Sequence, residues 1–256
     1  MKIVGMIPAR MASTRFPGKP LTRILGLTML EHVYRRSRLC SALEDVVVTT
    51  CDEEIRAAVA AFGARVIMTS DRHERAAERV AEAAGQSDAD VVVMIQGDEP
   101  MLRPEMLDEL VAPLRADPAI HCTNLMLNVD EADARNPDQV KVVCDVNGNA
   151  LYMSREPLPT PHSGRASRWW RQIGLIAFRR HFLARLMALP PTPLERVESV
   201  DMLRALEHGL PVRMVPTQHT TYPVDMPGDV AKVEALMQGD PWLASYAHLA
   251  KGVSPW

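Results

Sequence analysis

Over the first 115 residues of the chain, the spacing of the hydrophobic residues switches repeatedly between a pattern typical of strands and a pattern typical of helices. Four short apolar runs have the length and composition of buried strands: residues 3–7, 45–50, 64–68 and 91–95. Between and after them, apolar residues recur every three or four positions, which predicts helices over residues 29–40, 53–62, 75–84 and 104–112. We expect Gly63 and Gly85 to end two of these helices, and Pro113 to end the last.

Four strands that alternate with four helices predict an α/β fold with a mostly parallel central sheet and helices on both faces. In such sheets, ligands bind beyond the carboxyl ends of the strands. Arg10 and Asp98 both come just after a predicted strand. A basic loop and an acidic turn are therefore expected to face one crevice.

The second half of the chain is less regular. Its predicted strands cover residues 122–127, 140–144, 150–154, 172–178 and 212–215, and its predicted helices cover residues 180–189, 199–208 and 229–237. The turn signal Asp145-Val-Asn-Gly-Asn149 predicts a hairpin between the second and third of these strands. Residues 239–256 read as a C-terminal extension, either a short extra helix or a loosely held segment.

Composition narrows the classes of function. The chain has 256 residues, of which 47% are hydrophobic and 24% charged, and its net charge is −3, so no general attraction to nucleic acid is expected. No apolar stretch is long enough to span a membrane. The four cysteines are widely spaced and form no CxxC pair, which favours reduced thiols in a cytoplasmic protein.

The loop after the first strand concentrates positive charge. Arg10, Arg15 and Lys19 lie within a stretch of ten residues just after the strand, among the stiffening residues Pro17 and Gly18. Arginine supplies forked donors and lysine a point charge, the two ways in which proteins hold phosphate oxygens. We favour a polyphosphate site over a merely solvated basic loop.

Two aspartates in turns are candidates for a divalent metal. Asp98 follows the strand at 91–95, and Asp225 lies in a Pro/Gly-bracketed turn near the end of the chain. Mg²⁺ usually takes one or two protein carboxylates and completes its octahedron with phosphates and water. A plain turn or N-cap role for Asp98 is the alternative, and spacing alone leaves open whether the two residues meet. Neither a GxGxxG nor a GxxxxGK[ST] motif is present, which argues against dinucleotide-binding Rossmann proteins and P-loop NTPases.

Several ordered blocks resemble those of the 3-deoxy-manno-octulosonate (KDO) cytidylyltransferases, also called CMP-KDO synthetases. The strongest block is Ile7-Pro-Ala-Arg-Met-Ala-Ser-Thr-Arg-Phe-Pro-Gly-Lys-Pro-Leu21. Further matches are Gln96-Gly-Asp-Glu-Pro100, Asn136-Pro-Asp-Gln-Val-Lys-Val-Val143, Ala150-Leu-Tyr-Met-Ser-Arg155, Ile173-Gly-Leu-Ile-Ala-Phe-Arg179, Pro193-Leu-Glu195 and Val224-Asp-Met-Pro-Gly-Asp229.

The resemblance implies a GT-A-like nucleotidyltransferase fold, a homodimer, and Mg²⁺-dependent transfer of CMP from CTP to an acid with release of pyrophosphate. It implies a catalytic domain over residues 1–238, in which residues 120–190 form a lobe for dimerisation and acceptor binding. The CTP-binding residues would be Arg10, Met11, Ala12, Ser13, Arg15, Lys19, Gln96 and Asp98. Of these, Arg10, Lys19 and Asp98 would be catalytic, and Asp98 and Asp225 would hold the metal.

The sequence also departs from the family pattern. Where the family usually has Ser-Gly-Thr, this chain has Arg75-Ala76-Ala77, and a His and a Gln expected near the sugar acid are replaced by Gln172 and Met202. A buried hydroxyl without a partner costs about 1–3 kcal/mol, so these losses argue against KDO itself.

We therefore predict a smaller, more anionic acceptor, for example a phosphonate. Its oxygens would be held by Arg75, by Arg155 and by an arginine of the loop at 165–171. The acceptor-binding residues would be Arg75, Arg155, Gln172, Glu195 and Met202. For the loop arginines, solvation or pairing with acids across a dimer is an equally good interpretation.

Three alternatives remain at this stage. The first is a CMP-KDO synthetase acting on KDO or a related sugar acid. The second is a sugar-1-phosphate nucleotidyltransferase, which the absence of a glycine-rich opening disfavours. The third is an inactive nucleotide-binding module, against which the joint presence of Arg10, Lys19, Asp98 and Asp225 argues.

Overall fold

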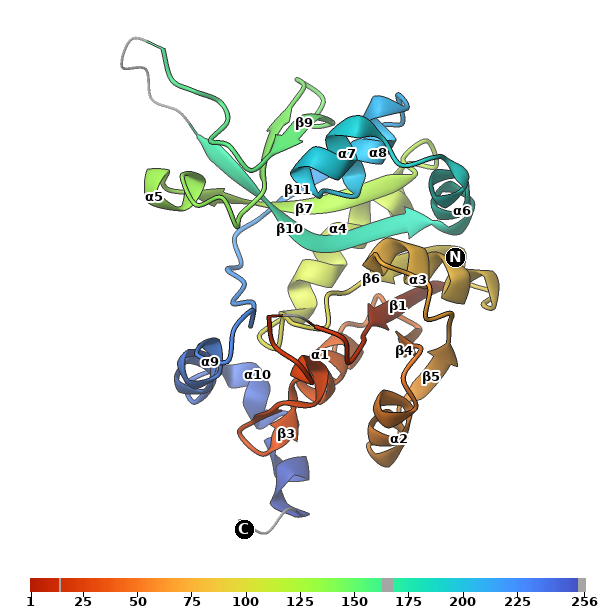
Figure 1. Cartoon of the computed structure of the whole chain (residues 1–256), viewed down its shortest axis with the longest axis vertical. Coiled ribbons are helices and arrows are strands. Elements are labelled where there is room, and N and C mark those ends of the chain that lie inside the picture. Colours follow the sequence, from red (N-terminus) through yellow and green to blue (C-terminus); the bar gives the residue numbers. More distant parts are fainter. Residues whose placement is uncertain (14, 163–167, 253–256) are drawn as a thin grey trace.

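A computed structural model of the chain describes residues 1–13, 15–162 and 168–252. Within these residues, a nine-stranded sheet forms the centre of the molecule (Figure 1), with the main strand order β11-β7-β10-β6-β1-β4-β5. Its strands are β1 (Ile3–Pro8), β4 (Asp45–Thr50), β5 (Arg65–Met68), β6 (Val91–Met94), β7 (Cys122–Val129), β8 (Lys141–Cys144), β9 (Ala150–Ser154), β10 (Trp169–Arg179) and β11 (Arg213–Thr217). The short strands β2 (Arg23–Ile24) and β3 (Leu27–Thr28) pair apart from it.

The predicted parallel core is confirmed. Strand β1 pairs in parallel with β4 and β6, and β5 adds to β4 in parallel. Strand β10 then runs antiparallel between β6 and β7, and β11 is parallel to β7. The predicted hairpin is present as β8 and β9, with Gly148 in a left-handed conformation at φ 80°. Strand β8 joins the sheet through β10.

Helices cover both faces of the sheet. They are α1 (Met29–Arg38), α2 (Glu53–Ala61), α3 (Ala76–Gly85), α4 (Pro104–Ala116), α5 (Glu131–Ala134), α6 (Arg180–Ala188), α7 (Pro193–Glu198), α8 (Met202–Glu207), α9 (Asp229–Met237) and α10 (Pro241–Ala244), with the 3-10 turns η1 (Lys19–Leu21) and η2 (Ala247–Gly252). None of the helices in the described ranges is long and apolar enough to cross a membrane.

The alternation of side chains along β1 divides the core into two clusters. Ile3 and Ile7 face the cluster that packs under α1, α2 and α4, whereas Val4 and Met6 face the one under α3, α6 and α8. This two-sided burial explains why the central strands are almost wholly apolar.

Three predicted element boundaries were wrong. Helix α4 continues through Pro113 to Ala116 and buries Leu114 against the core, so hydrophobic packing outweighs the proline as a stop signal. The helix predicted over 199–208 begins only at Met202, because Ser199 adopts a left-handed conformation at φ 55° and separates α7 from α8. Strand β10 starts at Trp169, earlier than predicted, because Trp169 and Trp170 pair with β7.

Residues 239–246 of the C-terminal segment are packed against the body of the molecule. Figure 1 shows α9 and α10 beside α1 and β3, where they lie far from α7 and α8. The Tyr246 ring is buried, and its hydroxyl contacts His32 Nδ1 at 3.0 Å and accepts a hydrogen bond from Arg36 Nε at 2.8 Å. Arg36, fully buried, also pairs with Asp240. Residues 239–246 therefore close the face of α1.

Candidate active site

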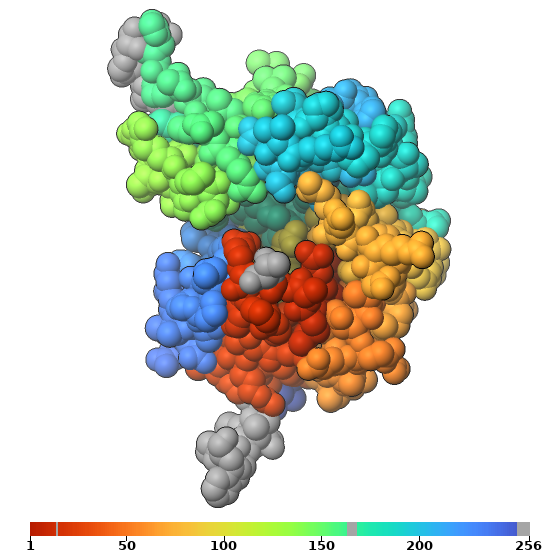
Figure 2. Space-filling model, viewed as in Figure 1, coloured from red at the N-terminus to blue at the C-terminus, as the bar shows by residue number. Residues whose placement is uncertain are grey.

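A cavity of about 340 Å³ opens beyond the carboxyl ends of β1 and β6. The space-filling view is hollowed where the red N-terminal part of the chain faces the green and cyan part (Figure 2). The cavity is lined by Pro8, Ala9, Arg10, Ala12, Ser13, Arg15, Lys19, Pro20, Met29, His73, Glu74, Arg75, Ala76, Arg79, Gln96, Gly97 and Asp98. The predicted basic loop and acidic turn thus meet in one crevice.

Backbone contacts fix the basic loop after β1. The Met11 N–H donates to Asp52 Oδ2 at 2.8 Å, and the Phe16 N–H donates to Ser13 Oγ at 3.3 Å. Gly18 has a φ of 71°, a conformation that favours glycine, and it leads directly into the turn η1 that carries Lys19. The side chain of Met11 packs against the core instead of lining the cavity. The loop therefore presents Arg10, Ser13 and Lys19 on a rigid backbone.

Two aspartates converge on the Lys19 ammonium. Lys19 Nζ lies 2.8 Å from Asp98 Oδ2 and 3.4 Å from Asp225 Oδ1. Arg15 Nη2 lies 3.0 Å from the same Asp225 oxygen. The Val224 N–H donates to the Asp98 carbonyl oxygen at 3.0 Å, which ties the C-terminal turn to the end of β6. Residues more than a hundred positions apart in the sequence are thus brought together.

This arrangement fits a divalent cation. Asp98 and Asp225 share the Lys19 ammonium, Asp225 also pairs with Arg15, and both carboxylates are partly open to solvent. No cluster of three or more acidic, histidine or cysteine side chains that could hold a metal occurs within the described ranges. Mg²⁺ does not need one, because phosphates and water supply the rest of its ligands.

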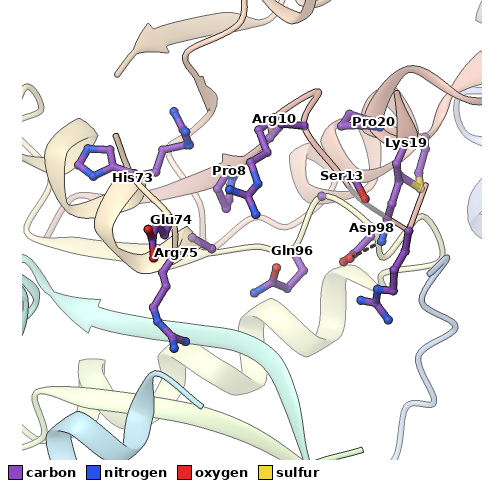
Figure 3. Close-up of a pocket in the computed structure, with 17 residues that line it drawn as sticks. Pro8, Arg10, Ser13, Lys19, Pro20, His73, Glu74, Arg75, Gln96 and Asp98 are labelled. Atoms are coloured by element: carbon purple, nitrogen blue, oxygen red, sulfur yellow. Dashed lines mark hydrogen bonds and ion pairs between the residues drawn. The ribbon is translucent and has the colours of Figure 1, made fainter. Parts of the chain in front are cut away.

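Gln96 lies at the centre of the cavity because two glycines leave room for it and its turn. A Cβ atom on Gly174 of β10 would come within 2.7 Å of Gln96 Cγ, and one on Gly97 within 3.1 Å of the Pro8 carbonyl oxygen. Figure 3 shows Gln96 between the Lys19–Asp98 pair and Arg75. A larger residue than glycine would clash at position 97 or position 174, which explains the glycine in the turn after β6 and the one in β10.

Glu99 is a buried acid beside the predicted metal ligand. Its side chain is 7% exposed, and its Oε2 atom has no hydrogen-bond partner within the described residues. Burial, together with the negative charge of Asp98, raises the pKa of Glu99 to about 8. Sequence reasoning did not select Glu99, since the pattern gives no sign that its carboxyl is buried.

At the other side of the cavity lie His73, Arg75 and Arg79. Sequence reasoning did not select Arg79, which lies four positions after Arg75 on α3. Its guanidinium is buried, and Nη1 donates to Thr69 Oγ1 at 2.5 Å and to the Ser70 carbonyl oxygen at 3.2 Å. Its spacing of four residues from Arg75, which places both on one face of a helix, was the available signal.

Four predicted acceptor residues do not line the cavity. Met202 is fully buried in the core, and Glu195 is fully buried, with Arg204 Nη2 2.6 Å from its Oε1. Burial alone would raise the Glu195 pKa, but Arg204 holds that pKa below its usual value. Arg155 Nη1 donates to the Pro137 carbonyl oxygen at 2.9 Å, and Gln172 Nε2 donates to Asn124 Oδ1 at 2.7 Å.

The contact between Gln172 and Asn124 supports the central sheet. Asn124 Nδ2 in turn donates to the carbonyl oxygens of Ile173 and Leu175, so it supports the irregular stretch of β10 that contains Gly174. In the loop at 165–171, Arg165 lies outside the described residues, and Arg171 Nη2 donates to Thr221 Oγ1 at 3.1 Å. Among the predicted acceptor residues, Arg75 is the one that lines the cavity.

The comparisons with known proteins agree with this geometry. The profile described as cytidylyltransferase matches residues 4–214. The 3-deoxy-manno-octulosonate cytidylyltransferase of Myxococcus xanthus is 46% identical over 93% of this chain and 97% of its own length. The enzyme of that name from Geobacter metallireducens is 44% identical over 91% of this chain and 96% of its own.

A solved structure extends the agreement to three dimensions. It is that of CMP:2-keto-3-deoxy-manno-octonic acid synthetase complexed with CTP, with a TM-score of 0.90 and 38% identity over 93% of this chain and 99% of the other. The central sheet and its helices thus form a GT-A-like nucleotidyltransferase fold. On this evidence the chain belongs to the 3-deoxy-manno-octulosonate cytidylyltransferase family and is a CTP-dependent nucleotidyltransferase.

Proposed function

We propose that this enzyme transfers CMP from CTP to 3-deoxy-manno-octulosonate or a closely related sugar acid and releases pyrophosphate. The observation that carries the proposal is the convergence of Asp98, Asp225 and Lys19 beside the Arg10 loop, in a cavity with a second cationic side at Arg75. One side suits the triphosphate and the other an acid. A sugar-1-phosphate nucleotidyltransferase and an inactive module are disfavoured by the family assignment.

The side chains of the loop would bind and orient the triphosphate. Arg10, Arg15 and Lys19 supply positive charge, and Ser13 lines the same wall. The acceptor hydroxyl oxygen attacks the α-phosphorus in line with the departing pyrophosphate, so the new P–O bond forms as the α–β bridge breaks. Because no covalent enzyme intermediate is needed, catalysis rests on positioning and on charge neutralisation.

Mg²⁺ is part of the proposal, with Asp98 and Asp225 as its protein ligands. When bound, it would neutralise phosphate charge and lower the pKa of the acceptor hydroxyl. Lys19 would then turn from the carboxylates to the phosphates. The convergence of two carboxylates on one cation supports this assignment.

The acceptor is assigned mainly on the relatives. Enzymes 44% and 46% identical over nearly the whole chain carry 3-deoxy-manno-octulosonate in their names. The comparisons give no support to the phosphonate that the sequence departures suggested. Two of those departures serve the fold instead, since Met202 packs in the core and Gln172 supports Asn124.

A panel of acceptors tests the assignment. Pyrophosphate release from CTP and Mg²⁺ would be measured with 3-deoxy-manno-octulosonate, N-acetylneuraminate and a set of small phosphonates. We expect the highest kcat/KM for 3-deoxy-manno-octulosonate. A phosphonate that is turned over more efficiently than any sugar acid would overturn the proposed acceptor while leaving cytidylyl transfer in place.

We also propose a homodimer that forms through the half of the molecule built from β7 to β11 and α5 to α8, residues 122–217, here called the second lobe. Apolar side chains lie open to solvent on the β8–β9 turn, on β9 and on α7, with Val146 101%, Leu151 61% and Val197 83% exposed. These three are the most exposed large apolar side chains within the described residues, and exposed apolar surface is typical of an interface between protein chains.

A further inference from the structure

Arg75 lies with Arg79 on the side of the cavity opposite the basic loop, but the Arg79 guanidinium is buried and bonded to Thr69 and Ser70. Figure 3 shows the Arg75 side chain directed away from the basic loop, on the opposite side of Gln96 from the Lys19–Asp98 pair. Arg10, Arg15 and Lys19 all belong to one loop, whereas Arg75 comes from the start of α3. A triphosphate held by the loop would therefore leave Arg75 for a different ligand.

The backbone around Arg75 is fixed. Arg75 is the N-cap residue of α3, with an extended conformation at φ −109°. The Glu78 carboxylate accepts hydrogen bonds from the backbone N–H groups of Glu74 and Arg75, both at 3.2 Å. This contact sets the direction in which the Arg75 side chain leaves the helix.

One acid holds the guanidinium and leaves most of its donors free. Arg75 Nη1 donates to Asp201 Oδ1 at 2.5 Å, while Nε is 3.7 Å from Glu195 Oε1, beyond hydrogen-bond distance. Across the described part of the chain, the guanidinium makes no other hydrogen bond. A guanidinium carries five N–H donors, so a face suited to a second, bidentate carboxylate remains.

The surrounding charges leave Arg75 available. Glu195 is already neutralised by two hydrogen bonds from Arg204, at 2.8 and 2.6 Å, so it does not compete strongly for Arg75. The Arg75 side chain is 27% exposed, and the residue lines the cavity. Burial raises the pKa of Asp201, and Arg75 partly offsets that rise. An incoming acid group would meet a positioned and partly desolvated cation.

We propose that Arg75 is a specificity-determining residue of the acceptor site, whose guanidinium binds the carboxylate of the acceptor while Asp201 holds it in place. This inference rests on the proposed function and names the group that recognises the acid. Asp201 acts through Arg75 and is a positioning residue.

The test compares the free acid of the acceptor with its methyl ester, which lacks the charge. The variants are Arg75→Ala and Arg75→Gln, the second of which keeps a donor toward Asp201 if the first does not fold. Arg72→Ala is the matched control, because Arg72 is exposed on the same loop and does not line the cavity. Initial rates of pyrophosphate release give kcat and KM for each acceptor and for CTP.

We expect both Arg75 variants to raise the KM of the free acid by about 10- to 100-fold, with little change for the ester. The KM for CTP should stay within about twofold of wild type, and Arg72→Ala should match wild type. Equal losses for acid and ester, or a rise confined to CTP, would overturn the assignment of Arg75.

The result is separable from the proposed function. If the wild-type enzyme prefers a phosphonate to any sugar acid, the proposed acceptor is wrong, and the same comparison with that acid and its ester decides the role of Arg75. A wild-type enzyme that releases pyrophosphate with no acid at all would overturn both.

Discussion

The Lys19 ammonium occupies the place between two carboxylates that the proposed metal would take. Lys19 is only 12% exposed, compared with 31% for Asp98 and 39% for Asp225. Carboxylates brought so close repel each other unless a cation lies between them. The basic loop therefore supplies its own counter-charge to the acidic turn, and the two parts of the site stabilise each other before any ligand binds.

Replacing Asp225 tests the metal assignment at a single residue. Asp225→Ala removes one of the two acids that face Lys19, so we expect kcat/KM with Mg²⁺ to fall by about 100-fold or more. The Mg²⁺ concentration needed for half-maximal rate should also rise. Pyrophosphate release measured over a Mg²⁺ titration gives both quantities.

Asp88→Ala provides the control, because Asp88 is an exposed acid that pairs with Lys2 away from the cavity. An Asp225→Ala enzyme with an unchanged Mg²⁺ dependence would show that Asp225 is not a metal ligand.

The positions of some site residues could be predicted from the sequence, because those residues follow the ends of strands in the central sheet. Arg10, Lys19 and Asp98 follow strand ends, so the sheet topology alone brings them into one crevice. Met202 and Glu195 were misplaced because their positions depend on α7, whose separation from α8 turns on the backbone of Ser199. No periodic pattern encodes a single left-handed residue.

At the scale of elements, the C-terminal segment depends on α1. His32 Nε2 lies 2.7 Å from the Ile24 carbonyl oxygen, which can only accept, so Nε2 carries the proton and donates it. His32 Nδ1 therefore accepts a hydrogen bond from the Tyr246 hydroxyl. The Tyr246 oxygen in turn accepts one from Arg36 Nε. This chain of donors requires a neutral imidazole. Burial and the charge of Arg36 lower the pKa of His32 to about 4, while its bond to Ile24 and the charge of Glu234 oppose the shift.

The buried histidine predicts an acid-sensitive stability. Below the ordinary pKa of 6.5 the unfolded chain takes up a proton at this residue, whereas the folded chain does so only near pH 4. The free energy of unfolding should therefore fall between pH 6.5 and pH 4, by about 3 kcal/mol at most from this group. Urea unfolding at a series of pH values measures the fall.

His32→Gln should lower stability at neutral pH but flatten this part of the profile. His208→Gln, at an exposed position after α8, serves as its control. If His32→Gln unfolds with the same pH dependence as wild type, the neutral imidazole contributes nothing to that dependence.

The order of elements could be predicted from the sequence better than their ends. The central strands were recognisable because burial on both sides makes them wholly apolar, as in residues 45–50 and 91–95. Pro113 was misleading, because the packing of Leu114 extends α4 past it. Tertiary contacts decide such boundaries, and a local pattern does not contain them.

At the scale of the whole molecule, the most exposed large apolar side chains of the described residues lie on the second lobe. Val197→Asp places a charge where the proposed dimer would bury a valine that is 83% exposed in the single chain. We expect light scattering to show a dimer for wild type and a monomer for this variant at micromolar concentration, because an unpaired buried charge is costly.

The control is Lys232→Asp, at an exposed position of α9. Val230 on the same helix is unsuitable as a control, because it packs against the buried cluster that contains Val224 and Val233. A Val197→Asp protein that stays dimeric would place the interface elsewhere.

One strand links the two halves of the enzyme. Strand β10 pairs with β6 near Arg179 and with β7 and β8 near Trp170, so the same backbone passes from the nucleotide crevice into the second lobe. The ladder between β10 and β7 shifts register between Gln172 and Ile176, so the irregular stretch around Gly174 lies between the two halves. The Arg75–Asp201 pair bridges the same two halves at the acceptor side of the cavity, so the proposed carboxylate receptor is built from both of them.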